Sequence, residues 1–192
     1  MFEQNLKATI NKFSTIKDKD WNALLDSFEI KHLKKGEYFI HDGQVCNHIG
    51  FLNTGILRVF YVEGDKEFTS FFNFGNRNPL ISAFTSFFTR QPSKESIHAL
   101  EDSEIGLIHY DKLQHLYDKS FELQKLGRLM AEYNYILAME RIYSLQHQSA
   151  TERYNNLLKI YPQLVNHVPH HYIASYLGIT AESLSRIRKN TV

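Results

Sequence analysis

The residues with the clearest capacity for chemistry lie near the end of this sequence. Ala174, Gly178 and Leu184 have the spacing of a helix-turn-helix. The alanine lets two helices approach, the glycine can take a left-handed turn, and the leucine closes the core. Thr180 is placed to cap the second helix, and Glu182 in its first turn suits the positive end of the helix dipole. The spacing therefore predicts a helix that can enter the major groove of DNA.

The candidate site consists of the side chains that such a helix would turn toward DNA. Arg186 can bond to guanine through two hydrogen bonds, and Glu182 can accept one from cytosine. Arg188 and Lys189 would meet phosphates, as would a charged histidine at the start of the first helix. The predicted DNA-binding residues are Thr180, Ala181, Glu182, Ser183, Ser185, Arg186, Arg188, Lys189 and His170. A helical hairpin with a purely structural role has the same spacing and stays open as an alternative.

The distribution of charge agrees with a basic C-terminal end. The net charge is +1, but residues 1–118 carry 13 Lys and Arg against 16 Asp and Glu, whereas residues 119–192 carry 9 against 5. A small basic cluster is also typical of a solvated helix end, so charge alone does not establish a nucleic-acid partner.

Metal and nucleophilic chemistry have weaker support. The single cysteine, Cys46, excludes an internal disulfide and a four-thiolate metal site within one chain. A jelly-roll enzyme of the cupin type needs two histidines that are separated by one residue, and no two candidate histidines have that spacing. The scattered candidate ligands are His41, His48, Glu63, Glu67, His98 and His109. We therefore expect no metal site and no cofactor, and a metal-dependent enzyme of this type remains the alternative from that class.

The elements that must position the C-terminal site change character along the chain. Residues 3–28 predict one or two short helices, with Asp18 as a cap. Short apolar runs rich in Phe, Tyr, Ile and Val then alternate with turn residues, which is typical of a jelly roll. The predicted strands are 37–40, 48–52, 56–62, 66–72, 96–99 and 104–108, and residues 79–88 between the fourth and fifth have helical spacing.

A long helix is predicted from about Ser120 to Gln148 and would be roughly 40 Å long. Its apolar stripe is broad enough to pack on the roll along one side and on a second copy of itself along another. The predicted dimer contacts are Leu126, Leu129, Met130, Tyr133, Ile136 and Leu137. A helix buried within its own chain, or a dimeric sensor module that does not bind DNA, are the alternatives.

These elements predict an α+β fold in three parts. An N-terminal double-stranded β-helix (jelly-roll) domain spans 1–118, the long dimerisation helix spans 119–148, and the helix-turn-helix domain spans 149–192. The chain has 192 residues, of which 43% are apolar, enough to bury one medium core or two small ones. Because it has no apolar run of ~18 residues and no secretion-signal pattern, we expect a cytoplasmic protein without a membrane partner.

The order of roll, long helix and helix-turn-helix resembles the Crp/Fnr family of bacterial transcription regulators. The resemblance is carried by 35–43, similar to the family's first hairpin, by 55–58, similar to its second glycine turn, and by 179–187, similar to its recognition helix. With 99–104, it is close to the branch common in Bacteroidetes. It implies a cyclic-nucleotide-binding-like roll, a homodimer on a palindromic operator of double-stranded DNA, RNA polymerase as a further partner, and half-sites ~34 Å apart.

Two departures from the family pattern concern the ligand and the bases. Cyclic-AMP-binding members have a Gly-Glu pair for the ribose and an Arg followed by Ser or Thr for the phosphate. Those positions fall here on Ser82-Ala83 and Ser93-Lys94, with Arg90 or Lys94 as a replacement cation. We therefore do not expect cyclic AMP to be the effector. Either an unknown small molecule binds in the roll, or phenylalanines fill the roll and it binds none. Many members also have Arg where this chain has Ala181.

Overall fold

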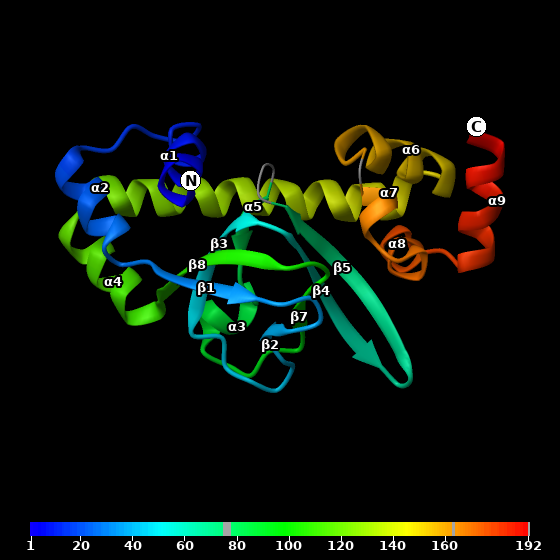
Figure 1. Ribbon diagram of the computed structural model, residues 1–192, viewed down its shortest axis with the longest axis horizontal. Coiled ribbons are helices and arrows are strands. Elements are labelled where there is room, and N and C mark those ends of the chain that lie inside the picture. The colour runs from blue at the N-terminus through cyan, green and yellow to red at the C-terminus, as the bar shows by residue number, and fades with distance from the viewer. Residues whose placement is uncertain (75–77, 163, 192) are drawn as a thin grey trace. The chain divides into compact units, whose positions relative to one another are not determined.

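In the part of the chain that the structure describes, two four-stranded sheets form the centre of the fold, in the order β1-β8-β3-β6 and β2-β7-β4-β5. The computed structural model describes residues 1–74, 78–162 and 164–191 (Figure 1). The strands are β1 (Glu29–Leu33), β2 (Tyr38–Ile40), β3 (His48–Thr54), β4 (Ile56–Glu63), β5 (Lys66–Phe74), β6 (Leu80–Ile81), β7 (Ser96–Ala99) and β8 (Ser103–His109). This arrangement confirms the predicted jelly roll.

The chain divides into two compact units. One comprises Met1–Val59 and Phe72–Asn134, which we call the roll unit. The other comprises Phe60–Phe71 and Tyr135–Val192, which we call the C-terminal unit. The division within the long helix falls between Asn134 and Tyr135, so each unit contains one half of that helix. The domain boundaries at 118/119 and 148/149 stay a prediction.

Runs of buried side chains build the core of the roll unit. Phe51, Leu52, Leu57, Ile97 and Ile105 are all at most 1% exposed. Four consecutive residues of β3 and five of β4 are buried, and successive residues of a strand point to opposite faces of its sheet. These strands are therefore covered on both faces, which accounts for the short continuous apolar runs in the sequence.

A glycine is required where β3 turns into β4. Gly55 has φ +102°, and a Cβ at this position would lie 2.0 Å from Ser103 Oγ. Only a residue without a side chain fits both this backbone conformation and this close approach.

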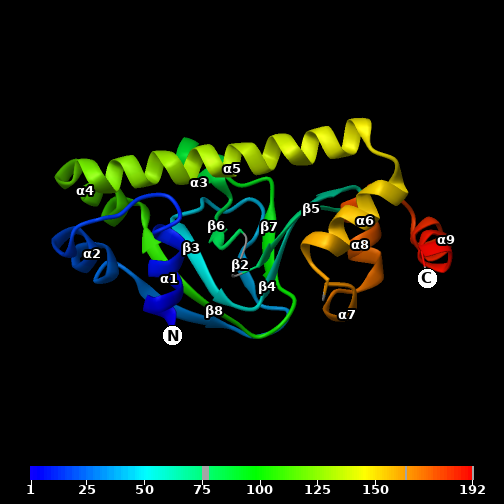
Figure 2. The same cartoon turned by 90° about the horizontal axis from the view of Figure 1, so that it is seen from above.

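Five helices accompany the described strands of the roll unit or begin within it (Figure 2). They are α1 (Phe2–Ile10), α2 (Asp18–Leu25), α3 (Phe84–Thr89), α4 (Tyr110–Lys119) and α5 (Phe121–His147). Two predictions need correction: Lys17 rather than Asp18 is the cap of α2, and residues 79–88 contain the short strand β6 before α3. Strand β1 was not predicted, because four of its five residues are exposed and show no alternation.

Four short helices form the body of the C-terminal unit. They are α6 (Ala150–Ile160), α7 (Leu164–His167), α8 (His170–Leu177) and α9 (Ala181–Thr191). Ser149 and Glu152 form a reciprocal capping box at the start of α6, in which each side chain bonds the other residue's backbone N–H. The buried side chains that hold these helices together are Tyr154, Leu157, Leu164, Val168, Ile173, Ala174, Leu177 and Leu184.

The C-terminal unit also contains the tip of the β4–β5 hairpin. Ser175 Oγ on α8 accepts a hydrogen bond from Thr69 N at 2.9 Å and donates one to Glu67 O at 3.1 Å. Because β5 lies at the edge of its sheet, these backbone groups are open to a partner other than a strand. These two hydrogen bonds join Ser175 of α8 to the edge strand β5.

Candidate nucleic-acid interface

The turn between α8 and α9 has the geometry that the three-point spacing predicts. Gly178 ends α8 in the left-handed conformation, with φ 66° and ψ 35°. Its N–H donates to Ser175 O, and Ile179 N donates to Ala174 O, both at 3.0 Å. These bonds satisfy carbonyls that the end of a helix would otherwise leave open. Ala174 and Leu184 are each 2% exposed, so the two helices meet through them.

The first turn of α9 is organised by side-chain hydrogen bonds. Thr180 Oγ1 accepts from Ser183 N at 3.2 Å, which makes Thr180 the predicted cap. Arg186 Nη2 donates to Ser183 Oγ at 3.2 Å. The pKa of Glu182 is lowered by hydrogen bonding to its own backbone N–H, then by Thr180 and by Arg186, so this carboxyl is an ionised acceptor.

One face of α9 carries most of the predicted site to solvent. Ala181, Glu182, Ser185, Arg186 and Lys189 are exposed and recur at intervals of one and three or four residues, which places them on one side of a helix. Thr180 and His170 are also exposed, whereas Ser183 and Arg188 are half-buried. The structure thus brings together all nine residues predicted for DNA binding within the α8–α9 pair.

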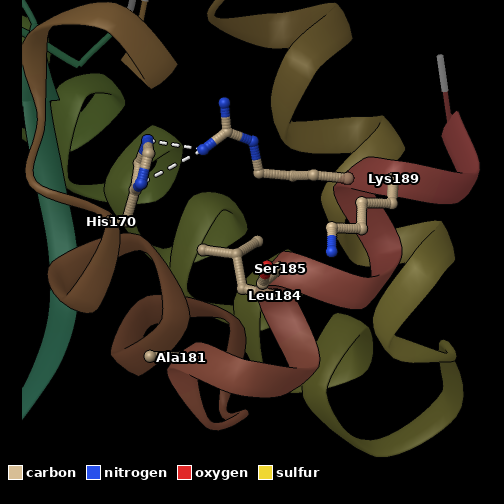
Figure 3. A pocket seen from close by; sticks show the side chains of 6 residues that line it. His170, Ala181, Leu184, Ser185 and Lys189 are labelled. Atoms are coloured by element: carbon tan, nitrogen blue, oxygen red, sulfur yellow. Dashed lines mark hydrogen bonds between the residues drawn. The ribbon is translucent and has the colours of Figure 1, made fainter.

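A hollow of about 320 Å³ opens between the start of α8 and the face of α9 (Figure 3). It is lined by His170, Ala181, Leu184, Ser185, Arg188 and Lys189. Arg188 Nη1 lies 2.6 Å from His170 Nε2 and 3.1 Å from Nδ1. A guanidinium has no acceptor, so Arg188 donates and the ring nitrogen that accepts is unprotonated.

Two arginines that the sequence did not single out bind the end of α8. Arg141 on α5 donates to Tyr176 O, and its guanidinium lies 3.8 Å from the centre of the Tyr176 ring. Arg153 on α6 donates through Nε to Leu177 O at 2.9 Å. Burial lowers the pKa of Arg141. Both cations face the carbonyl end of a helix, where positive charge is favourable, and so orient α8. No sequence signal marks them, because their partners are 24 and 35 residues away.

Three of the five residues predicted for an effector pocket, Ser82, Ser93 and Arg90, form hydrogen bonds inside the roll unit. Ser82 Oγ donates to His48 O at 3.0 Å and lies 3.3 Å from Cys46 Sγ. Ser93 Oγ donates to Glu95 O at 2.7 Å. Ala83 is 1% exposed, and Lys94 is exposed to solvent. The two serines therefore serve as internal bonding groups.

Arg90 also has structural partners. It has φ 60° at the end of α3, and its Nη1 donates to Cys46 O at 2.8 Å and to Phe87 O at 3.1 Å. Its Nη2 donates to Asn47 Oδ1, and the guanidinium lies 4.3 Å from the centre of the Tyr110 ring. The planar fork thus pins α3 to the segment before β3, which engages the donors that a phosphate would need.

The long helix carries an exposed apolar stripe further along than predicted. Leu126 is 4% exposed and lies in the core of its own chain, and Tyr133 packs edge-on against Phe13. Leu129, Met130 and Leu137 are half-buried. The stripe of exposed apolar side chains comprises Tyr135, Ile136, Met139, Ile142, Tyr143 and Leu145. Of the six predicted dimer residues, Ile136 belongs to this stripe and the other five do not.

No group of three or more potential metal ligands gathers in residues 1–74, 78–162 and 164–191. In the roll unit, the rings of His48 and His109 meet edge to face at 5.1 Å. Burial, and then His109, lower the pKa of His48. In the same described ranges, no helix is both long and apolar enough to cross a membrane.

Known proteins share the fold of this chain. Residues 30–120 match the family described as cyclic nucleotide-binding domain. FixK2 from Bradyrhizobium japonicum is 17% identical with a TM-score of 0.70, covering 85% of this chain and 83% of that one. A putative transcriptional regulator of the crp/fnr family from Eubacterium rectale is 17% identical with a TM-score of 0.70, covering 91% and 83%.

The catabolite activator protein of Thermus thermophilus is 18% identical with a TM-score of 0.58, covering 93% of this chain and 84% of that one. No curated protein sequence matches the chain significantly. At these identities the likeness shows a shared fold: a cyclic nucleotide-binding domain followed by a long helix and C-terminal helices. The comparisons give no support to a particular taxonomic branch.

Proposed function

We propose that this chain is a sequence-specific DNA-binding transcriptional regulator of the Crp/Fnr type, acting as a homodimer on a palindromic operator. The observation that carries the proposal is the exposed face of α9, which begins at a capped, left-handed turn and presents Glu182 and Arg186 one helical turn apart. The fold it shares with proteins described as a catabolite activator and a crp/fnr regulator supports the same reading.

The chemistry of this face suits base edges. An ionised Glu182 accepts from the amino group of cytosine, and Arg186 can donate two parallel hydrogen bonds to guanine. The Ala181 methyl can contact a thymine methyl. The bond from Arg186 to Ser183 holds the guanidinium near the start of the helix, so less side-chain freedom is lost when DNA binds.

A second copy of the chain is the partner that the exposed stripe of α5 supports. Six large apolar side chains stand on one helix with more than two fifths of their surface in solvent. Their spacing of three and four residues is that of a helix–helix seam. A two-fold dimer would present two recognition helices, for which half-sites ~34 Å apart are expected.

The effector, if there is one, is proposed to be something other than a cyclic nucleotide bound in the usual way. The serines at the two cradle positions bond within the chain, and the fork of Arg90 is engaged by carbonyls and by Tyr110. A cyclic phosphate would lack its bidentate cation, and each unmade bond to a buried charged group costs about 1–3 kcal/mol. Calorimetric titration with cyclic AMP and cyclic GMP is expected to give no binding, and a micromolar constant for either would contradict this part.

Selection of the purified protein on random duplex DNA at ~100 mM salt tests the main proposal, because counterion release makes affinity depend on salt. A palindrome with half-sites one turn apart is the expected result. In the Arg186→Ala variant, affinity for the selected site should fall by about 1–3 kcal/mol and specificity should relax at one base pair.

Lys159→Ala is the matched control, because Lys159 is exposed on α6 and its loss removes the same charge. That variant should bind nearly as well as the unchanged protein. Equal losses in both variants would mean that α9 contributes charge without reading bases.

A further inference from the structure

We propose that the hollow between α8 and α9 seats one backbone phosphate of DNA, and that His170 takes up a proton when this phosphate binds. The inference rests on the proposed function and deepens it, since it makes operator affinity dependent on pH. The ligand is a phosphodiester, and the residues that hold it are His170, Arg188, Lys189 and Ser185.

The lining of the hollow selects an anion. Among its six residues, all within the described chain, three can carry positive charge, one offers a hydroxyl, and none carries a carboxylate. The carboxylate in the first turn of α9, Glu182, is bonded to the start of its own helix. The hollow also includes Ala181 and Ser185 of the exposed face, so a duplex seated on that face brings its backbone to this point.

His170 and Arg188 are hydrogen-bond partners at one side of the hollow. A guanidinium only donates, so the contact of 2.6 Å needs a lone pair on the ring nitrogen, which an imidazolium does not have. The contact also turns the Arg188 guanidinium toward His170. Protonation of His170 and this contact with Arg188 therefore exclude each other.

A phosphate changes the partner of both groups. Its oxygens accept hydrogen bonds from the guanidinium fork and from an imidazolium, so Arg188 can exchange the ring nitrogen for the anion. The freed imidazole then lies beside a negative charge, which favours its protonated form. The other charged groups that line the hollow are Arg188 and Lys189 of α9, and the neighbouring ionisable groups of α8 and α7, His171 and His167, supply no negative charge.

The coupling has a defined magnitude. Histidine is the side chain that commonly changes charge between about pH 5 and 8, so the effect is sought in this range. Uptake of one proton per protomer strengthens binding by up to about tenfold for each pH unit lowered through this range. A dimer that fills both hollows gains up to the square of that factor.

The test measures the dissociation constant for the selected operator by fluorescence anisotropy at about pH 8, 7 and 6 and constant ionic strength. The unchanged protein should bind at least fivefold more tightly at the lowest pH than at the highest. His170→Gln, which keeps an acceptor for Arg188 and cannot take up the proton, should bind with a nearly flat pH profile. His115→Gln is the control, because His115 is an exposed histidine of α4 in the other unit.

A second measurement counts protons directly. Calorimetry in two buffers of different ionisation enthalpy at about pH 7 should show net proton uptake on binding, and the uptake should disappear in His170→Gln. A pH-independent affinity, or a slope unchanged by His170→Gln, would overturn the inference and leave the proposed regulator standing. If the unchanged protein showed no specific DNA binding at any pH, the proposed function would be refuted as well.

Discussion

Replacing Arg141 by methionine should loosen α8 from the long helix. The methionine keeps the apolar stem and much of the volume of the arginine, but it removes the donor to Tyr176 O and the cation above the Tyr176 ring. Arg153 still holds the neighbouring carbonyl of Leu177, so the helix end loses one of its two cationic contacts.

The expected loss follows from those two contacts. A hydrogen bond from a charged donor contributes about 1.5–3 kcal/mol, and a partly desolvated cation–π contact adds about 0.5–2 kcal/mol. Part of this is returned, because the variant no longer buries a charge whose lowered pKa reports the cost of burial. The net effect should be a loss of about 2–3 kcal/mol in the local stability of α8.

Amide hydrogen exchange is the suitable assay, since a chain with two units need not unfold in one step. Amides of α8 should exchange about 30 to 150 times faster in Arg141→Met, because 1.4 kcal/mol corresponds to a factor of ten. Arg128→Met is the matched control: Arg128 lies on the same helix and pairs with the exposed Glu132, a contact with an expected contribution of about 0.3–0.5 kcal/mol. If the two variants exchanged within threefold of each other across α8, the proposed anchoring role of Arg141 would be wrong.

Two further predictions concern the roll unit. Gly55→Ala should destabilise it by more than about 2 kcal/mol, because φ is +102° and the new methyl would overlap Ser103; a urea midpoint equal to that of the unchanged protein would contradict this. Burial and His109 lower the pKa of His48 from its ordinary value of 6.5, so the folded state binds this proton more weakly than the unfolded chain. Stability should therefore be full above about pH 6.5 and fall as the pH drops toward the folded pKa, and His48→Asn should reduce that fall in melting temperature between about pH 7.5 and 5.5.

Local patterns were sufficient to predict most of the elements. Six strands follow from short apolar runs between turn residues, and the long helix and the pair α8 and α9 follow from apolar and small residues at helical spacing. The two strands without such a pattern, β1 and β6, were not predicted. Strand β1 is largely exposed, and β6 has only two residues, so neither shows alternation.

The candidate site was predicted in its position and only partly in its contacts. Thr180, Gly178 and Leu184 act within a few residues of one another, and their roles at a cap, a turn and a core position follow from residue type and spacing. The likeness in fold to solved regulators accords with this order of elements.

The partners of the charged side chains were decided by the tertiary structure alone. Arg90 was a candidate for an effector phosphate and instead pins α3 to Cys46 and Tyr110. Arg188, a candidate for a DNA phosphate, has His170 as a partner within the chain. A long flexible cation can reach many acceptors, and packing brings one of them close from 18 to 44 residues away. The sequence by itself therefore determined where the helices, strands and exposed face occur, because those depend on neighbours in the chain. Which cations remain available to a ligand depends on contacts between distant segments, and only the folded chain decides it.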